Sequence, residues 1–372
     1  MSSRRSPRTA TRRPHRRGAE RVTLILVLAS VLASVALVSL PAGVAAADDA
    51  NEVHTGVAYG TEPEQKLDLY LPPADERNGA AVVLVHGGGW AKGKRQSMAP
   101  TAERLAGEGF VAATVDYRLV GQTDHAFPDA VHDVQLSVQW LADNAHRYGV
   151  DDDKIGMIGS SAGGHLAAMV ATLGTTGDPT EKPLATEPSG TQVAAVVSWS
   201  GLFDLATLVP GEDEACDNDP ECIAVTRANL VTDFLGCTPK ECPGRYAEAS
   251  PIDHVGTSTA PMFLANSTEE LIPLSQPDAM INRLTAAGVP NSHQYLPGRA
   301  HASLYQNQVW GSTESFLRRH LGVEKPTLAD WLVPTITAAL LIAVLATVAV
   351  RERTRHEQLT GEGSPASAGD RP

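Results

Sequence analysis

Two adjacent serines, Ser160 and Ser161, lie between glycines in the segment 159–163, which reads GSSAG. An apolar run, KIGMI, precedes this segment, and a helix-forming run, GHLAAMVA, overlaps its end. A Gly-x-Ser-x-Gly pattern between a strand and a helix is typical of a tight turn that exposes the middle serine as a nucleophile. Glycines two residues to either side let the neighbouring backbone come close without Cβ clashes. The sequence therefore predicts Ser161 as the nucleophile and Ser160 as its neighbour.

The segment 86–90, HGGGW, places three consecutive glycines directly after an apolar run. Such glycines allow backbone N–H groups to point into a site, where they stabilise the negative oxygen of a tetrahedral intermediate. We expect the N–H groups of Gly88, Gly89 and Ala162 to form this oxyanion hole. The alternative is a glycine-rich loop that has no part in catalysis.

Apolar runs alternate with helix-forming runs along most of the chain. Strand-like runs occupy residues 53–59, 66–72, 80–85, 111–119, 154–158, 192–201, 260–267 and 291–298. Helix-like runs occupy residues 97–110, 127–149, 165–174, 274–288 and 312–322. The first two strands are expected to pair antiparallel, and the rest predict an α/β fold with a mostly parallel, doubly wound sheet and helices on both faces. The segment 201–258 breaks the alternation, and we expect it to be an insertion over the site.

In combination, these motifs resemble the α/β-hydrolase superfamily, in particular the carboxylesterase and lipase branch that carries HGGGW and G-x-S-A-G-G and includes hormone-sensitive-lipase-like enzymes. Further resemblance lies in LDLYLP, DYRL, FPDAVHDVQLSVQWL and ASPIDHV, and it covers the chain from Val53 to Leu321. The resemblance implies the α/β-hydrolase fold. It also implies hydrolysis of carboxylic esters without a metal or organic cofactor, by a triad of Ser, Asp or Glu, and His in that chain order.

The resemblance implies that the catalytic histidine follows Ser161 and lies in the last loop of the domain. His301, in LPGRAHASLY, comes after a predicted strand and before the closing helix, and its loop is similar to the family's. His293 lies inside a predicted strand, and His254 precedes the segment of the acid. We therefore expect His301 to be the general base.

For the triad acid, the family usually reads H-G-x-x-D-x-x-V-P, whereas this chain reads ANSTEELIP at 265–273. The residue four positions before Pro273 is Glu269, so the resemblance implies Glu269 as the acid in place of the commoner aspartate. A glutamate can also orient and stabilise the imidazolium. Glu270 and Asp278 are the alternatives.

Other polar residues in the motifs are expected to have structural roles. His165 is interpreted as a helix residue near the site, and His86 is expected to brace the oxyanion loop. Asp116, Arg118 and Asp133 resemble structural positions of the family, where they form buried ion pairs or caps.

The N-terminal region is typical of an export signal. Eight Arg and one Glu precede Val22, an apolar stretch runs to Leu40, and Ala45 and Ala47 form an A-x-A cleavage pattern. Residues 1–47 are therefore predicted to be a signal peptide, or an N-terminal anchor if cleavage fails. The rest of the chain has 22 basic and 42 acidic residues, a formal charge of −20. That charge disfavours binding to nucleic acid or to anionic lipid through the body.

A second apolar segment, 331–350, contains no charged residue. At ~1.5 Å per helical residue it matches the ~30 Å hydrocarbon core of a bilayer, so we predict a transmembrane helix there, with a buried C-terminal helix as the alternative. RERTR follows at 351–355, and the positive-inside rule predicts a cytoplasmic tail over 351–372. Residues 48–322, the expected hydrolase domain, and the linker 323–330 would then lie outside the cell.

All four cysteines, Cys216, Cys222, Cys237 and Cys242, lie within the expected insertion. In an exported protein this clustering favours disulfides. The sequence allows three connectivities. We favour the two local pairs, Cys216 with Cys222 and Cys237 with Cys242, because each closes a short loop. A zinc site is the alternative.

The sequence taken as a whole predicts an exported, membrane-tethered serine ester hydrolase in which Ser161, His301 and Glu269 act through an acyl-enzyme. The expected substrate is a small-molecule or polysaccharide ester, with neither nucleic acid nor a cofactor or metal involved. Acyl transfer to a cell-envelope acceptor is the alternative within catalysis. A non-catalytic surface binding module is the alternative from another class.

Overall fold

The computed structural model describes residues 51–123, 126–174, 191–208, 227–323 and 328–360. The chain divides into two compact units, which are treated separately. One unit, Asp49–Lys325, contains the whole sheet. The described part of the other unit is the long helix α9, Leu328–Thr360. The predicted signal peptide, residues 1–47, lies outside the described residues.

Eight strands of the described residues form a single sheet in the order β1-β2-β4-β3-β5-β6-β7-β8. Pairs β1–β2 and β2–β4 are antiparallel, and all other neighbours are parallel. The strands are β1 Glu52–Ala58, β2 Lys66–Leu71, β3 Ala81–Val85, β4 Val111–Val115, β5 Ile155–Ser160, β6 Ala195–Trp199, β7 Met262–Ser267 and β8 Asn291–Leu296. The prediction of a mostly parallel sheet that begins with an antiparallel pair is therefore confirmed.

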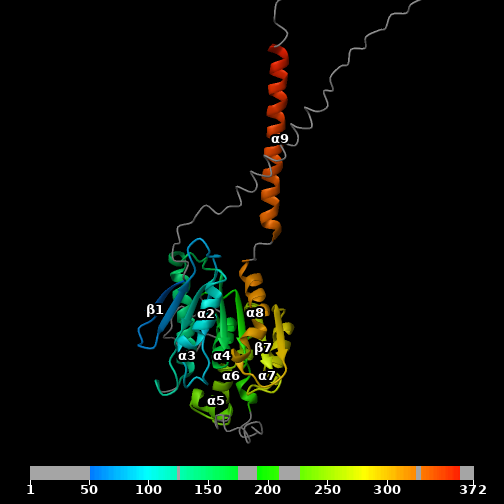
Figure 1. Cartoon of the computed structure of the whole chain (residues 1–372). Coiled ribbons are helices and arrows are strands. Elements are labelled where there is room, and N and C mark those ends of the chain that lie inside the picture. The colour runs from blue at the N-terminus through cyan, green and yellow to red at the C-terminus, as the bar shows by residue number, and fades with distance from the viewer. Residues whose placement is uncertain (1–50, 124–125, 175–190, 209–226, 324–327, 361–372) are drawn as a thin grey trace, which may run out of the picture. The chain divides into compact units, whose positions relative to one another are not determined.

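Helices cover both faces of the sheet (Figure 1). Helices α2 and α8 pack into one hydrophobic core, and α3, α4 and α7 pack into the other. The longer helices of this unit are α2 Ala99–Ala106, α3 Ala126–Asp143, α4 Ala162–Leu173, α5 Arg227–Leu235, α6 Pro243–Glu248, α7 Ser275–Ala286 and α8 Gln306–Leu321. Short 3₁₀ turns are η1 Arg95–Met98, η2 Ala145–Tyr148, η3 Leu205–Thr207, η4 Pro251–His254 and η5 Ala302–Tyr305.

The central strand β3 shows why an unbroken apolar run forms a strand here. All five of its residues are fully buried. Val83 and Val85 contribute to one core, and Val82 and Leu84 contribute to the other, because successive side chains point to opposite faces. A strand that is covered on both faces needs apolar residues at every position, and the sequence has them.

The parallel strands place their carboxyl ends at one edge of the sheet, where α/β proteins bind ligands. Ser161 follows β5, Ser200 follows β6 and Glu270 lies three residues beyond β7. His301 lies in the connection between β8 and α8. The topology thus brings together polar residues that are up to 140 positions apart in the sequence.

Within the expected insertion, the described residues form η3, α5, α6 and η4. Cys237 and Cys242 form a disulfide with a Cα–Cα distance of 6.2 Å, as predicted. It joins the end of α5 to the beginning of α6. The other predicted pair, Cys216 with Cys222, lies outside the described residues.

The segment 331–350, for which a membrane span is predicted, lies within α9. Across the residues that the structure describes, no helix combines the length and the apolar character that crossing a membrane requires.

Candidate active site

Ser161 lies on the tight turn between β5 and α4. Its backbone has φ 56° and ψ −119°, a conformation that L-residues rarely adopt. Its N–H donates to the carbonyl of Trp199 at 2.7 Å, which ties the turn to β6. A Cβ on Gly159 would lie 2.1 Å from the carbonyl oxygen of Gly163, and one on Gly163 would lie 2.2 Å from that of Val85. Both glycines are therefore required by close backbone packing, as the motif predicts.

The two serines of the turn differ in their accessibility. Ser160 is 5% exposed, whereas Ser161 is partly exposed. Oγ of Ser161 lies 2.9 Å from Nε2 of His301. The structure therefore brings together the predicted nucleophile and the predicted base.

On its other side, His301 contacts a buried carboxylate. Nδ1 of His301 donates to Oε2 of Glu270. The Glu270 side chain is fully buried, while that of His301 is 27% exposed. A hydrogen-bonded chain thus runs from the interior of the domain through Glu270 and His301 to the hydroxyl of Ser161.

The prediction of Glu269 as the acid is wrong in the structure, since the carboxylate on His301 belongs to Glu270. The chain turns sharply after β7, and Oε1 of Glu270 accepts the N–H of Ser267 at 2.7 Å. This turn directs the Glu270 side chain inward. Glu269 is exposed, and its backbone N–H donates to the carbonyl of Gly298 at 3.0 Å. The count of four residues before Pro273 did not account for this turn.

Asp278 and His254 have partners outside this hydrogen-bonded chain. Asp278 accepts the hydroxyl of Tyr295 at 2.6 Å, and Nε2 of His254 bonds to the carbonyl of Glu248 at 2.8 Å. His293 lies in β8, as expected, and is exposed.

The glycine loop after β3 passes beside the nucleophile. A Cβ on Gly87 would lie 3.1 Å from Cβ of Ser161. Gly88 and Gly89 have φ of 120° and 59°, values that favour glycine. Ala162 is the first residue of α4, so its N–H belongs to the first turn, where the helix provides no acceptor. The glycine loop and the first turn of α4 thus lie next to Ser161, and the oxyanion hole at these N–H groups stays a prediction.

His86 supports the start of this loop. Its ring stacks on Tyr117 with centroids 4.4 Å apart, and its Nδ1 donates to the carbonyl of Gly87 at 2.8 Å. The Tyr117 hydroxyl donates to the carbonyl of His86 at 2.9 Å. Burial lowers the pKa of His86, which favours the neutral ring.

Ion pairs fix the loops around the glycine segment. Nη2 of Arg118 lies 2.7 Å from Oδ1 of Asp133, and Asp116 pairs with Arg95. Arg95 also pairs with Asp68 at 2.7 Å. The expectation that Asp116, Arg118 and Asp133 are structural ion-pair residues agrees with these contacts.

His165 is fully buried in α4 and has a partner on each nitrogen. Nε2 donates to the carbonyl of Ala249 at 2.8 Å, and Nδ1 accepts the indole N–H of Trp90 at 3.3 Å. Only the neutral ring can make both bonds, because a charged imidazolium has no acceptor. Burial lowers the pKa of His165 to about 4.

This lowered pKa predicts how stability depends on pH. His165 takes up a proton near pH 6.5 in the unfolded chain and near pH 4 in the folded chain. The contribution of the neutral ring to the free energy of unfolding is therefore fully present above pH 6.5 and is lost as the pH falls toward 4. The loss amounts to about 3 kcal/mol at most. Urea unfolding of wild type and His165→Gln at pH 7, 5.5 and 4.5 measures it. We expect a smaller decline in the variant, and equal declines would contradict the assignment.

Three residues around Glu270 were not predicted from the sequence: Ser200, Ser267 and Tyr305. All three are buried and bonded to the acid or to one another. The one feature they share is that each lies at or just beyond the end of an element: Ser200 follows β6, Ser267 ends β7 and Tyr305 ends η5.

Among the described residues, no group of three or more His, Cys, Asp or Glu side chains is arranged to hold a metal ion.

Comparisons with known proteins agree with this fold. A family model described as BD-FAE matches residues 67–284. Esterase LipC of Mycobacterium tuberculosis is 33% identical over 255 residues, which are 66% of this chain and 58% of LipC. The probable isoprenylcysteine alpha-carbonyl methylesterase ICME of Oryza sativa is 30% identical over 282 residues, 75% of this chain and 65% of ICME. The chain thus spans less than two thirds of the length of these relatives.

Solved structures share the fold. A truncated carbohydrate esterase from gut microbiota superposes with a TM-score of 0.60 and 24% identity, covering 74% of this chain and 99% of that one. Est2, a thermophilic esterase of Thermogutta terrifontis, gives a TM-score of 0.57 and 24% identity, covering 75% and 95%. At this identity the likeness identifies the α/β-hydrolase fold.

Proposed function

Because the chain belongs to the BD-FAE family, we propose that it hydrolyses carboxylic esters as a serine esterase, through an acyl-enzyme. One observation carries the proposal: the hydrogen-bonded chain from Glu270 through His301 to Ser161, beside the glycine loop. A nucleophile, a base and an acid in this order are the minimum that acyl transfer through a serine needs. The esterase names of the relatives support the same reaction class.

In the first step, Oγ of Ser161 attacks the ester carbonyl carbon and Nε2 of His301 takes the hydroxyl proton. The carbonyl π bond breaks, and its electrons move to the oxygen. When the tetrahedral intermediate collapses, the bond to the alcohol oxygen breaks and His301 returns its proton to that oxygen. A water molecule then attacks the acyl-enzyme with the same histidine as base, and releases the acid and free Ser161.

Glu270 and the glycine loop act on charge during these steps. Glu270 accepts a hydrogen bond from the Nδ1–H of His301. This bond leaves the Nε2 lone pair facing Ser161 and stabilises the imidazolium that forms. The N–H groups of Gly88, Gly89 and Ala162 are proposed to bind the oxyanion. A donor in this position contributes about 100- to 1,000-fold to kcat in serine enzymes.

The proposal is tested with the purified full-length chain and a panel of p-nitrophenyl esters of rising acyl length. Acetylated xylan is added to the panel, because one solved neighbour is a carbohydrate esterase and the proposed substrates include carbohydrate esters. We expect release of p-nitrophenol that depends on Ser161. A parallel reaction contains an acceptor sugar, and an acylated sugar would indicate acyl transfer instead. If no ester in the panel is cleaved, the proposed function is wrong.

We further propose that the hydrolase domain is exported and tethered to the cell membrane. This part rests on the sequence alone: the basic head and apolar stretch within 1–47, and the uncharged segment 331–350 before RERTR. Protease added to intact cells is expected to digest the hydrolase domain and to spare a tag placed after Pro372. Removal of that tag from intact cells would contradict the orientation, and protection of the hydrolase domain would contradict export.

A further inference from the structure

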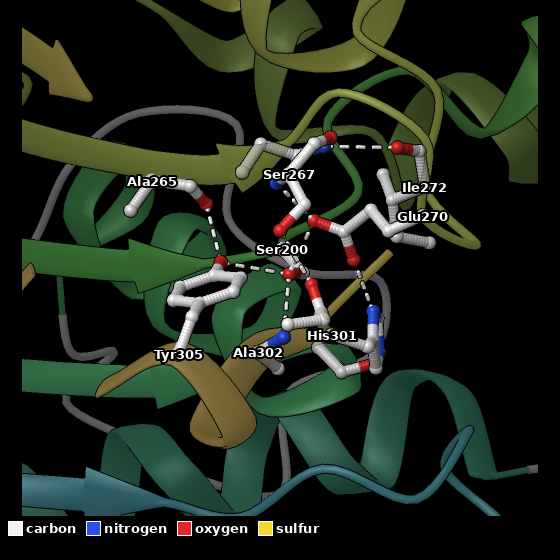
Figure 2. A network of polar contacts seen from close by, with 11 residues as sticks. Ser200, Ala265, Ser267, Glu270, Ile272, His301, Ala302 and Tyr305 are labelled. Carbon is white, nitrogen blue, oxygen red and sulfur yellow. Dashed lines mark hydrogen bonds and ion pairs between the residues drawn. The ribbon is translucent and has the colours of Figure 1, made fainter. Parts of the chain in front are cut away.

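Ser200, the residue directly after β6, lies at the centre of a polar network behind the proposed triad (Figure 2). Its side chain is completely buried. Oγ lies 2.8 Å from Oε1 of Glu270, 2.8 Å from the backbone nitrogen of Ala302 and 2.7 Å from the hydroxyl of Tyr305. One hydroxyl therefore contacts the acid and also the backbone next to the base.

The number of available protons determines the direction of these bonds. The Ala302 N–H can only donate, and the Glu270 carboxylate can only accept. Burial raises the pKa of Tyr305, so its hydroxyl keeps its proton. Ser200 therefore accepts from Ala302 and donates to Glu270, and the Tyr305 hydroxyl donates to the carbonyl of Ala265 at 2.7 Å. In this arrangement the single proton of Ser200 is committed to the carboxylate.

The backbone at this point is strained in a way that serves the network. Ser200 has φ 53° and Ala302 has φ 50°, both in the left-handed region. Residues other than glycine cost energy there and persist where the surroundings hold them. The two residues are joined by the hydrogen bond that the Ala302 N–H donates to Ser200 Oγ.

We propose that Ser200 is a positioning residue of the esterase site, which holds the Glu270 carboxylate and the backbone of the His301 loop in a fixed relation. The inference rests on the proposed function. It adds Ser200, at the end of β6, to the proposed triad, whose serine and glutamate follow β5 and β7. Ser200 does not act on the substrate itself. It fixes the rotation of the carboxylate, so that Oε2 faces Nδ1 of His301 while Oε1 is occupied.

The network predicts a partial effect when Ser200 is lost. Oε1 of Glu270 also accepts the N–H of Ser267 at 2.7 Å, so one donor remains. The carboxylate stays in place but can rotate more freely. A hydrogen bond to a charged group is typically strong enough that we expect Ser200→Ala to lower kcat by roughly 10-fold to 100-fold. KM should stay within about twofold, because a rise in KM reports lost substrate binding. Ser200 contacts the acid and the His301 loop instead.

The experiment measures kcat, KM and Tm of the full-length chain on p-nitrophenyl acetate. Ser200→Gly accompanies Ser200→Ala, because glycine adopts φ 53° without strain and so removes the hydroxyl from a backbone that still folds. Ser198→Ala is the matched control: Ser198 is also buried, lies two residues earlier in β6, and its hydroxyl has no hydrogen-bond partner among the described residues. We expect both Ser200 variants to lose kcat, with Ser200→Gly keeping a Tm close to wild type, and Ser198→Ala to keep wild-type kinetics.

A double-mutant cycle separates positioning from general structural support. In a Glu270→Ala background, Ser200→Ala should cost less than about twofold, since the group it orients is gone. An equal cost in both backgrounds, an equal loss in Ser198→Ala, or wild-type kcat in both Ser200 variants would each overturn the inference. These results leave the proposed function standing as long as Ser161→Ala is inactive. An active Ser161→Ala would instead refute the proposed function.

Discussion

Ser161→Ala is expected to abolish ester hydrolysis, with a loss of roughly 10⁶-fold in kcat, as in serine proteases that lose their nucleophile. The reason is geometric as well as chemical. Oγ of Ser161 is the atom 2.9 Å from Nε2 of His301, and no other hydroxyl is bonded to that nitrogen in the described structure. Folding should be little affected, because the side chain is partly exposed and alanine is no more strained than serine at φ 56°.

Ser160→Ala is the control for this prediction. Ser160 is the last residue of β5, and its side chain is 5% exposed. We expect it to keep most of the wild-type kcat. Steady-state kinetics on p-nitrophenyl acetate, together with mass spectrometry of the chain after reaction with a serine-directed phosphonate, measure both variants. A phosphonate adduct on Ser160, or reversed activities of the two variants, would move the nucleophile by one residue.

Glu270→Gln is expected to lower kcat by roughly 10⁴-fold while the domain remains folded, as replacement of the acid by its amide does in a well-studied serine protease. The local contacts explain the size of the effect. The Oε1 position receives the Ser200 hydroxyl and the Ser267 N–H, so the amide oxygen will occupy it. The amide NH₂ then faces Nδ1 of His301, which must become an acceptor. The ring proton moves to Nε2, where it prevents removal of the proton of Ser161.

Glu269→Gln is the matched control, one residue away and exposed. Its kcat should stay within about twofold of wild type, because surface substitutions away from special features change little. Circular dichroism and kinetics on the same preparations distinguish lost catalysis from lost folding. If Glu269→Gln proved to be the more damaging substitution, the assignment of the acid to Glu270 would be wrong.

Much of the fold could be predicted from the sequence, because burial on two faces leaves a direct mark on it. β3 is apolar at every position, since helices cover it on both sides. Strand ends were less certain: the run 111–119 was expected to be a strand throughout, but β4 ends at Val115. Beyond Val115 the side chains form ion pairs, such as that of Asp116 with Arg95. The pattern of apolar residues does not reveal where the strand gives way to these ion-pair residues.

The proposed nucleophile and the glycine loop could be predicted from the sequence, because each depends on local backbone geometry. The turn at Ser161 needs glycines where a Cβ would lie about 2 Å from a carbonyl oxygen. Both of these glycines lie within the five-residue segment 159–163, so the turn can be recognised from the local sequence. The loop of Gly88 and Gly89 likewise needs positive φ. His301 was predicted from the resemblance to the family together with its position between β8 and α8.

Only the tertiary structure decided which glutamate reaches His301 and what holds it there. Glu269 and Glu270 are chemically identical and adjacent, and their difference comes from a turn after β7 that buries one carboxylate and exposes the other. The donors that fix the buried one come from the ends of β6 and β7, and are brought together because parallel strands end at the same edge of the sheet. The contact between Ser200 and Glu270 spans 70 positions, and such a long-range contact leaves no spacing rule in the sequence, since it depends on how separate strands pack.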